Sequence, residues 1–179
     1  MANLDAATVA HQATEVAANG PGQPWAIFLS AAAIIVAAAF GAWWQRRIAR
    51  HTLTINTIER QLWDGDYIGA RAKFISARDT KSPDELRQLA AKENAQHEDA
   101  AAIRSILNNY ELLSLGIITG VLDEGIYKRY FRTTFVSDYE LSRPFIEGLR
   151  QRNPRAYKEY TTLYEKWREN GNNRLHPGE

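Results

Sequence analysis

Apolar residues occur along this chain in two ways, first as one unbroken run and then at helical spacing. The unbroken run, residues 25–44, reads WAIFLSAAAIIVAAAFGAWW and contains no charged side chain. At about 1.5 Å per residue, a helix of this length spans roughly 30 Å, the hydrocarbon thickness of a bilayer. Trp25 begins the run and Trp43 and Trp44 end it, and indole rings favour the membrane–water interfaces. A buried helix of a soluble protein is the alternative, but these features favour a transmembrane helix over residues 25–44.

Basic residues are absent before this run and begin directly after it. All 22 Lys and Arg residues lie from Arg46 onward, and Arg46, Arg47 and Arg50 follow the run closely. Because positive residues stay in the cytoplasm, we predict a single-pass topology with the N-terminus outside and the C-terminal domain inside. Residues 1–24 then form a short outer tail. They lack the basic stretch with which a cleaved signal peptide begins.

Small residues recur at four-residue spacing within the run, at Ala33, Ala37 and Gly41. Residues so placed share one face and let two membrane helices approach closely, although an alanine-rich span produces such a match easily by chance. No helix breaker follows until Gly65, so residues 45–64 are predicted to continue the helix as a stalk. The stalk carries a seam of alternating four- and three-residue steps, typical either of a short coiled coil or of a docking face for later helices. This seam consists of Ile48, Thr52, Ile55, Glu59 and Leu62.

Residues 65–170 show apolar positions at helical spacing and no convincing period-two alternation. The segment Asp64-Gly65-Asp66 predicts a turn, with Gly65 ending one helix and Asp66 capping the next. The segment Ser82-Pro83-Asp84-Glu85 predicts a helix start with a reciprocal capping box. A central helix is predicted over about residues 99–119, with Gly120 ending it.

The helices after residue 120 are bounded by similar signals. Asp123 predicts the cap of a short helix to about Arg132, and a further helix to about Gln151 either restarts at Ser137-Asp138-Tyr139-Glu140 or is kinked by Pro144. Asn153-Pro154 predicts the start of the last helix.

The last helix carries an aromatic stripe that we predict to face the core, formed by Tyr157, Tyr160, Tyr164 and Trp167. Residues 171–179 read as a loose tail. The predicted fold class is all-α, a transmembrane helix that continues into an irregular cytoplasmic bundle of five or six helices.

Composition excludes several kinds of site. The chain has no cysteine, which excludes disulfides, thiolate metal ligands and a cysteine nucleophile. The part after the anchor has a formal charge near +3, too weak a basic excess to predict a nucleic-acid partner. Glu93 and His97 are four residues apart, but a metal site needs three or four ligands, so a solvated helix is the better interpretation and no metal or cofactor is expected.

The most suggestive polar group is Asn108, Asn109 and Glu111, which surround a predicted core tyrosine in the central helix. A carboxylate near a helix seam could be a buried acid or part of a ligand site. The plainer interpretation is that Glu111 pairs with an arginine such as Arg150 or Arg168, while the asparagines tie neighbouring helices together.

The central helix also carries residues that resemble a known family. Leu107-Asn108-Asn109-Tyr110-Glu111, with Leu113 and Gly116, followed by Asp123-Glu124, resembles domain-of-unknown-function family 4760. So do Ile146, Leu149-Arg150, Ala156-Tyr157 and Lys166-Trp167-Arg168. The resemblance covers roughly residues 46–168. It implies a membrane helix followed by a helical cytoplasmic part, in bacteria or their phages, and hence the bacterial cytoplasmic membrane. It implies no activity and no catalytic residue.

The expected function is a membrane-anchored, non-enzymatic interaction or scaffold protein, whose partners are the bilayer and either a second copy or another membrane-complex component. One alternative is a subunit or effector of a larger membrane system, in phage defence or stress signalling. The other is an enzyme centred on Glu111. No catalytic set is recognisable, because the chain has neither a phosphate-binding glycine-rich loop nor a nucleophile elbow.

Overall fold

The structure, a computed structural model, describes residues 24–172 and the side chains of residues 28–168. The outer tail up to residue 23 and the C-terminal tail from residue 173 therefore lie outside the described residues. Within the described range the chain forms six helices and no strand, which confirms the all-α class. Contacts divide the chain into two units, residues 1–48 and 49–179.

The first described helix, α2 (Pro24–Trp63), contains the predicted apolar run and the predicted stalk without interruption. It ends at Trp63, where the sequence predicts the end of the stalk. It is the one described helix that is long and apolar enough to cross a membrane. None of the side chains described in its apolar part is buried, and Phe28, Ile35 and Phe40 are among the most exposed.

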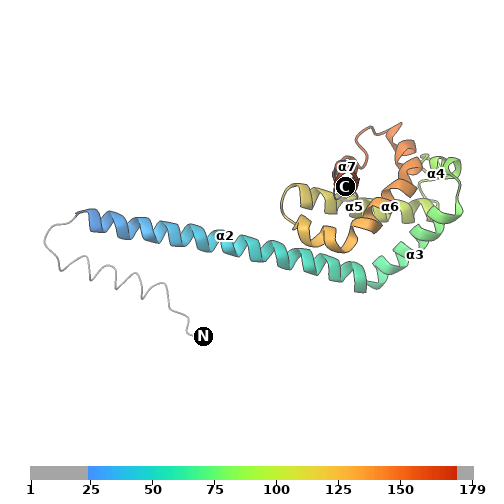
Figure 1. Cartoon of the computed structure of the whole chain (residues 1–179). Coiled ribbons are helices and arrows are strands. Elements are labelled where there is room, and N and C mark those ends of the chain that lie inside the picture. The colour runs from blue at the N-terminus through green and yellow to red at the C-terminus, as the bar shows by residue number, and fades with distance from the viewer. Residues whose placement is uncertain (1–23, 173–179) are drawn as a thin grey trace, which may run out of the picture. The chain divides into compact units, whose positions relative to one another are not determined.

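The second unit contains five further helices (Figure 1). They are α3 (Gly65–Thr80), α4 (Pro83–Leu89), α5 (Glu98–Ile118), α6 (Glu124–Arg150) and α7 (Lys158–Asn172). The central helix α5 packs against α3 and α7, while α6 packs against α4 and α7. This arrangement buries α5 on several sides, as its long apolar stripe predicts.

Most helix boundaries follow local signals. Ser82 and Glu85 form the predicted capping box, with both reciprocal hydrogen bonds present. Gly120 has a φ of 74°, a left-handed conformation that glycine adopts without steric cost, and it follows the end of α5. The predicted cap at Asp66 is wrong. Asp64 caps α3, because its side chain accepts a hydrogen bond from the Tyr67 N–H, and α3 begins one residue later at Gly65.

The segment after Asp123 forms one helix instead of two. Asp123 caps α6 as predicted, but α6 neither ends near Arg132 nor restarts at Ser137. Asp138 cannot act as a cap or turn residue there because its carboxylate is buried and engaged with arginines from another helix. Pro144 lies inside the continuous helix, where its missing N–H removes one helical hydrogen bond.

The last helix also begins later than predicted. Residues 154–157 form a turn, and α7 starts at Lys158 instead of at Asn153-Pro154. Tyr157 closes this turn with a φ of 53°, the single positive value among the described residues other than glycine. Its side chain is nevertheless buried, so the aromatic stripe keeps its predicted inward direction.

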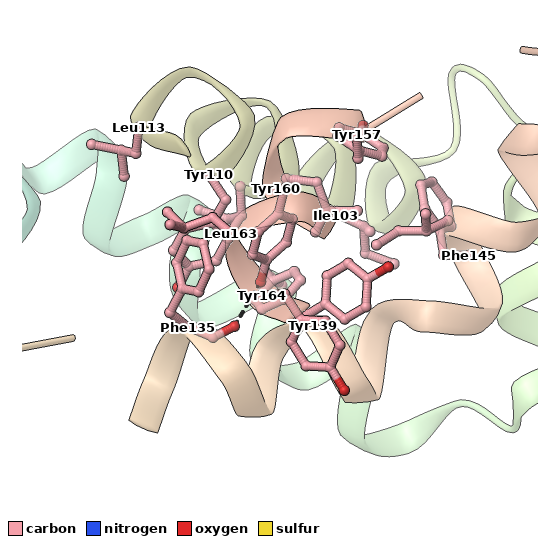
Figure 2. Close-up of a cluster of buried hydrophobic side chains, with 14 of the residues drawn as sticks. Ile103, Tyr110, Leu113, Phe135, Tyr139, Phe145, Tyr157, Tyr160, Leu163 and Tyr164 are labelled. Atoms are coloured by element: carbon pink, nitrogen blue, oxygen red, sulfur yellow. Dashed lines mark hydrogen bonds between the residues drawn. The ribbon is translucent and has the colours of Figure 1, made fainter. Parts of the chain in front are cut away.

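The core is an aromatic cluster shared by α5, α6 and α7 (Figure 2). The Tyr160 ring lies 5.0 Å from that of Tyr110 and 4.6 Å from that of Phe135, between ring centroids. Trp167 is 0% exposed and lies 4.6 Å from Phe135, which confirms that it is a core residue. Hydroxyl groups inside the cluster are satisfied, since Tyr160 donates to the Phe135 carbonyl at 2.9 Å.

The C-terminal part of α2 joins the second unit through one row of side chains, Thr54, Ile58 and Gln61, all of which are buried. The Thr54 hydroxyl donates to the Arg50 carbonyl and accepts from the Asp123 N–H, at 2.7 and 2.8 Å. Only the end of the predicted seam belongs to this docking face, because Leu62 is partly buried against the core. The two isoleucines of the seam, Ile48 and Ile55, are 51% and 45% exposed. The domain therefore covers Leu62 and leaves Ile55 open to solvent.

Candidate functional site

The predicted anchor residues lie where α2 leaves its apolar run. Trp43, Trp44, Arg46 and Arg47 are exposed, and the Arg47 guanidinium lies over the Trp43 ring at 5.8 Å. The side chain of Trp25 lies outside the described residues. Exposed indoles beside exposed arginines are the side chains expected at the headgroup level of a bilayer.

Arg50 belongs to the second unit and has a different environment. Its guanidinium lies 3.5 Å from the Leu122 carbonyl and 3.9 Å from the Asp123 carboxylate. His51 lies 3.3 Å from the same carboxylate. Arg50 therefore helps to hold the α5–α6 turn, in addition to any part it has in membrane topology.

The small residues predicted to associate helices remain open. Ala33 and Ala37 are exposed, and a Cβ built at Gly41 would meet no atom within 4 Å. Nothing in the described part of the chain covers this face.

The two asparagines of the predicted polar group tie α5 to its neighbours. The Asn109 Oδ1 accepts from Gln61 Nε2 of α2 at 2.8 Å, and the Asn108 Oδ1 accepts from the Tyr157 hydroxyl at 3.2 Å. Each contact joins segments about 50 residues apart, as the plainer interpretation predicts. Both asparagines therefore position helices.

Glu111 caps a helix that begins 47 residues further along the chain. Its carboxylate accepts hydrogen bonds from the main-chain N–H groups of Glu159 and Tyr160, at 3.2 and 2.8 Å. These are two of the N–H groups that the first turn of α7 leaves without a helical partner. The negative charge also complements the positive end of the helix dipole.

The predicted pairing of Glu111 with Arg150 or Arg168 is not what the structure shows. Arg150 donates to the main-chain carbonyls of Ala156 and Tyr157, and Arg168 donates to the Tyr164 hydroxyl. Both arginines donate to neutral acceptors close to them in sequence. The Glu111 carboxylate instead accepts hydrogen bonds from the N-terminus of α7.

A cleft of about 580 Å³ lies beside Glu111, between α5, the end of α6 and the turn before α7. Arginine and amide side chains dominate its polar wall. That wall includes Arg104, Arg152, Arg155, Asn108, Glu111 and Tyr157. Burial, together with the nearby Glu111 carboxylate, raises the pKa of Tyr157 to about 12 despite the opposing charge of Arg104, so this hydroxyl stays protonated at neutral pH. The cleft volume falls within the range of small-molecule sites.

The most deeply buried charge among the described residues, that of Asp138, was not predicted from the sequence. Its carboxylate forms ion pairs with Arg71 and Arg78 of α3 and accepts a hydrogen bond from the Tyr110 hydroxyl at 2.6 Å. Burial disfavours the charged form of Arg71, but the hydrogen bond to Asp138 and the electrostatic interactions with Tyr110, Asp138 and Tyr67 together outweigh it and raise the pKa of the guanidinium. The signal that could have found this network is a charged residue inside the aromatic pattern of α6, between Phe135 and Tyr139.

This network is enclosed and joins three helices. The pKa of Tyr110 is raised far above its usual value, first by burial and then by the Asp138 charge, so the phenol remains a hydrogen-bond donor. The arrangement is that of a structural ion-pair cluster, because Asp138 is 1% exposed and its carboxylate is occupied by Arg71, Arg78 and Tyr110.

Histidine and acidic side chains form no group of three or more that could hold a metal ion among the described residues. Glu93 lies in a turn and not on a helix with His97. His97 itself is the N-cap of α5, since its Nδ1 accepts from the Asp99 N–H at 3.2 Å.

Comparison with known proteins gives one family. No curated protein and no solved structure matches the chain. Residues 28–167 match a family described as "Domain of unknown function (DUF4760)". This stretch contains the apolar part of α2, the helices α3 to α6 and α7 as far as Trp167. Because the match covers most of the chain, this protein belongs to the DUF4760 family.

Proposed function

We propose that this protein is a non-enzymatic scaffold of the bacterial cytoplasmic membrane, anchored by residues 25–44, with its N-terminus outside and its helical domain in the cytoplasm. The apolar part of α2 supports the anchor, because it is long enough to span a bilayer and none of its described side chains is buried. Trp43 and Trp44, with Arg46 and Arg47 directly after them, supply the interfacial and positive-inside signals.

The observation that carries the scaffold function is the exposed seam of α2. A row of large apolar side chains at heptad spacing stabilises a helix only when it is covered. Ile48 and Ile55 are 51% and 45% exposed, whereas Leu62, at the end of the seam, is partly buried against the core beside the row through Ile58. The heptad spacing of the seam continues into the apolar run. It connects Leu62, Ile55 and Ile48 to Gly41, which belongs to the small-residue face, so both features lie on one line along α2.

A second copy of the chain is the partner that this register fits. A parallel pair would bring identical seams together at the same depth, and the glycine and alanines of the run would permit close approach within the bilayer. The scaffold would then hold two helical domains side by side beneath the membrane.

The test uses the full chain in lipid nanodiscs and a matched pair of substitutions. Ile55→Glu places a charge in the seam. Ile68→Glu places the same charge on α3, at a side chain of nearly equal exposure, 48% against 45%. We expect chemical cross-linking to give a dimer for the native chain and for Ile68→Glu, and a monomer for Ile55→Glu. A monomeric native chain, or a dimer that survives Ile55→Glu, would overturn the scaffold proposal.

The topology has its own test. A reporter fused after Glu179 is expected to be active only in the cytoplasm, and one fused before Met1 only outside. Replacing Arg46, Arg47 and Arg50 with glutamine should mix the two orientations, because they are the main charge asymmetry beside the span. An unchanged single orientation in this triple variant would contradict the assignment.

The contacts of Glu111 support a non-enzymatic protein over an enzyme centred on that residue. A general base or nucleophile needs a carboxylate oxygen free to reach substrate. Both oxygens of Glu111 already accept main-chain N–H groups of α7.

A further inference from the structure

The cleft beside Glu111 carries positive charges that the protein does not neutralise. Arg104, Arg152 and Arg155 line it, and none of the three forms an ion pair with a carboxylate of the described chain. Arg104 donates to the carbonyls of Ala95 and Leu89, and Arg152 donates to the carbonyl of Ala90. Neutral acceptors hold these guanidinium groups in place and leave their charge uncompensated.

Glu111 does not cancel this charge. It is the single acidic residue of the cleft wall, against three arginines, and its two oxygens are directed to the first turn of α7. A concave wall with excess charge of one sign concentrates ions of the opposite sign.

The arginines are also arranged for recognition of an oxyanion. A guanidinium has five N–H donors, so the hydrogen bonds to these main-chain carbonyls leave donors of Arg104 and Arg152 available. Packing of the Arg104 guanidinium over the Phe145 ring, at 5.8 Å, further fixes its position. The Arg155 side chain is exposed and makes no hydrogen bond or ion pair within the described protein, which leaves all its donors free. Two parallel N–H groups of one guanidinium can donate to two oxygens of the same phosphate group.

The turn that presents these residues is strained. Tyr157 has a φ of 53° although it is not glycine, and its hydroxyl bonds to Asn108 across the cleft wall. Backbone strain of this kind persists only where surrounding contacts hold it, and such residues concentrate at ligand sites. Here it places Arg155, Ala156 and Tyr157 around the cleft.

We propose that the cleft between α5 and the α6–α7 turn binds the phosphoryl group of a small anionic ligand, held by Arg104, Arg152 and Arg155. The ligand is either a free phosphate compound or the headgroup of a phospholipid, which share this chemistry. The site is independent of the α2 seam and does not rest on the scaffold proposal.

The test measures binding to the full chain in nanodiscs of zwitterionic phosphatidylcholine, by calorimetry, with pyrophosphate as the free probe. Arg155→Ala is the informative variant because its side chain supports no contact of the fold. Arg129→Ala is the control, an exposed arginine on α6 that does not line the cleft. We expect Arg155→Ala to weaken binding about tenfold, as for the loss of a hydrogen-bonded charge, and Arg129→Ala to leave it unchanged.

A second probe distinguishes the two sources of phosphate. Short-chain phosphatidylglycerol, used below its micelle concentration, presents the lipid headgroup. Tighter binding of this probe assigns the site to a lipid, and tighter binding of pyrophosphate assigns it to a free ligand. In either case Arg155→Ala must weaken the tighter interaction. The proposal is overturned if neither probe binds, or if both arginine variants weaken binding equally, since that would reflect only the overall charge.

Discussion

Replacing Glu111 with glutamine tests whether this carboxylate is a helix cap or a reactive group. Glutamine keeps the shape but presents one carbonyl oxygen and one NH₂ group. One of the two N–H groups of α7, on Glu159 or Tyr160, then faces a donor in place of an acceptor. Losing a charge-assisted hydrogen bond at a helix start costs about 1.5–3 kcal/mol.

The matching observable is the melting temperature of the full chain in detergent. For a domain of this size, 1 kcal/mol corresponds to roughly 3–5 °C, so Glu111→Gln is expected to lower the melting temperature by roughly 5–15 °C. Glu165→Gln is the control, because Glu165 is exposed on α7 and its substitution removes the same charge. A melting temperature equal to that of the control variant would refute the cap, and would return Glu111 to the list of candidate reactive groups.

Three further substitutions test the core and its charges. Trp167→Ala should destabilise the domain by about 3–5 kcal/mol in urea denaturation, because it removes a fully buried indole, and a loss below about 1 kcal/mol would place Trp167 outside the core. Asp138→Asn should cost roughly 3–5 kcal/mol because it removes the buried anion between Arg71 and Arg78, of which only Arg78 has a second carboxylate partner, and an unchanged denaturation midpoint would contradict the network. Burial opposes ionisation of Glu124, but hydrogen bonds from Lys166 and Trp167 lower its pKa below the model-peptide value of 4.5. Its contribution is therefore present above pH 4.5 and lost as the pH falls through the lowered pKa, so Glu124→Gln should destabilise at pH 7 and have little effect in strong acid.

Local signals in the sequence were sufficient for much of the fold. The capping box at Ser82, the glycine stop at Gly120 and the cap at Asp123 all act on N–H groups within a few residues, so their outcome does not depend on the rest of the chain. The central helix and the inward aromatic stripe follow from periodicity for the same reason.

The errors arose where a distant residue decides the local structure. The start of α7 depends on Glu111, which replaces the predicted cap at Asn153-Pro154. The continuity of α6 depends on Asp138, whose arginine partner Arg78 is 60 residues away and turns an apparent start signal into a core charge. A single sequence shows the carboxylates of Glu111 and Asp138 and their distant partners, but it does not show which residues are in contact in the fold.

The candidate site was predictable only in part. The polar group of Asn108, Asn109 and Glu111 was recognisable from its place beside a core tyrosine. The arginines of the cleft were not, because Arg104 lies on α5 and Arg152 in the α6–α7 turn, and only the packing of these two segments brings them together.

The attachment of α2 to the domain determines how tension along the chain would be borne. A force applied to the N-terminal end of α2 would first load two contacts with the α5–α6 turn. These are the contacts of Arg50 with Leu122 and of Thr54 with Asp123. The row through Ile58 and Gln61 would follow, one helical turn at a time. Contacts loaded in sequence separate at lower force than contacts loaded together. The stalk would thus separate from the α5–α6 turn before the load reaches α3 and, through it, α5 of the core.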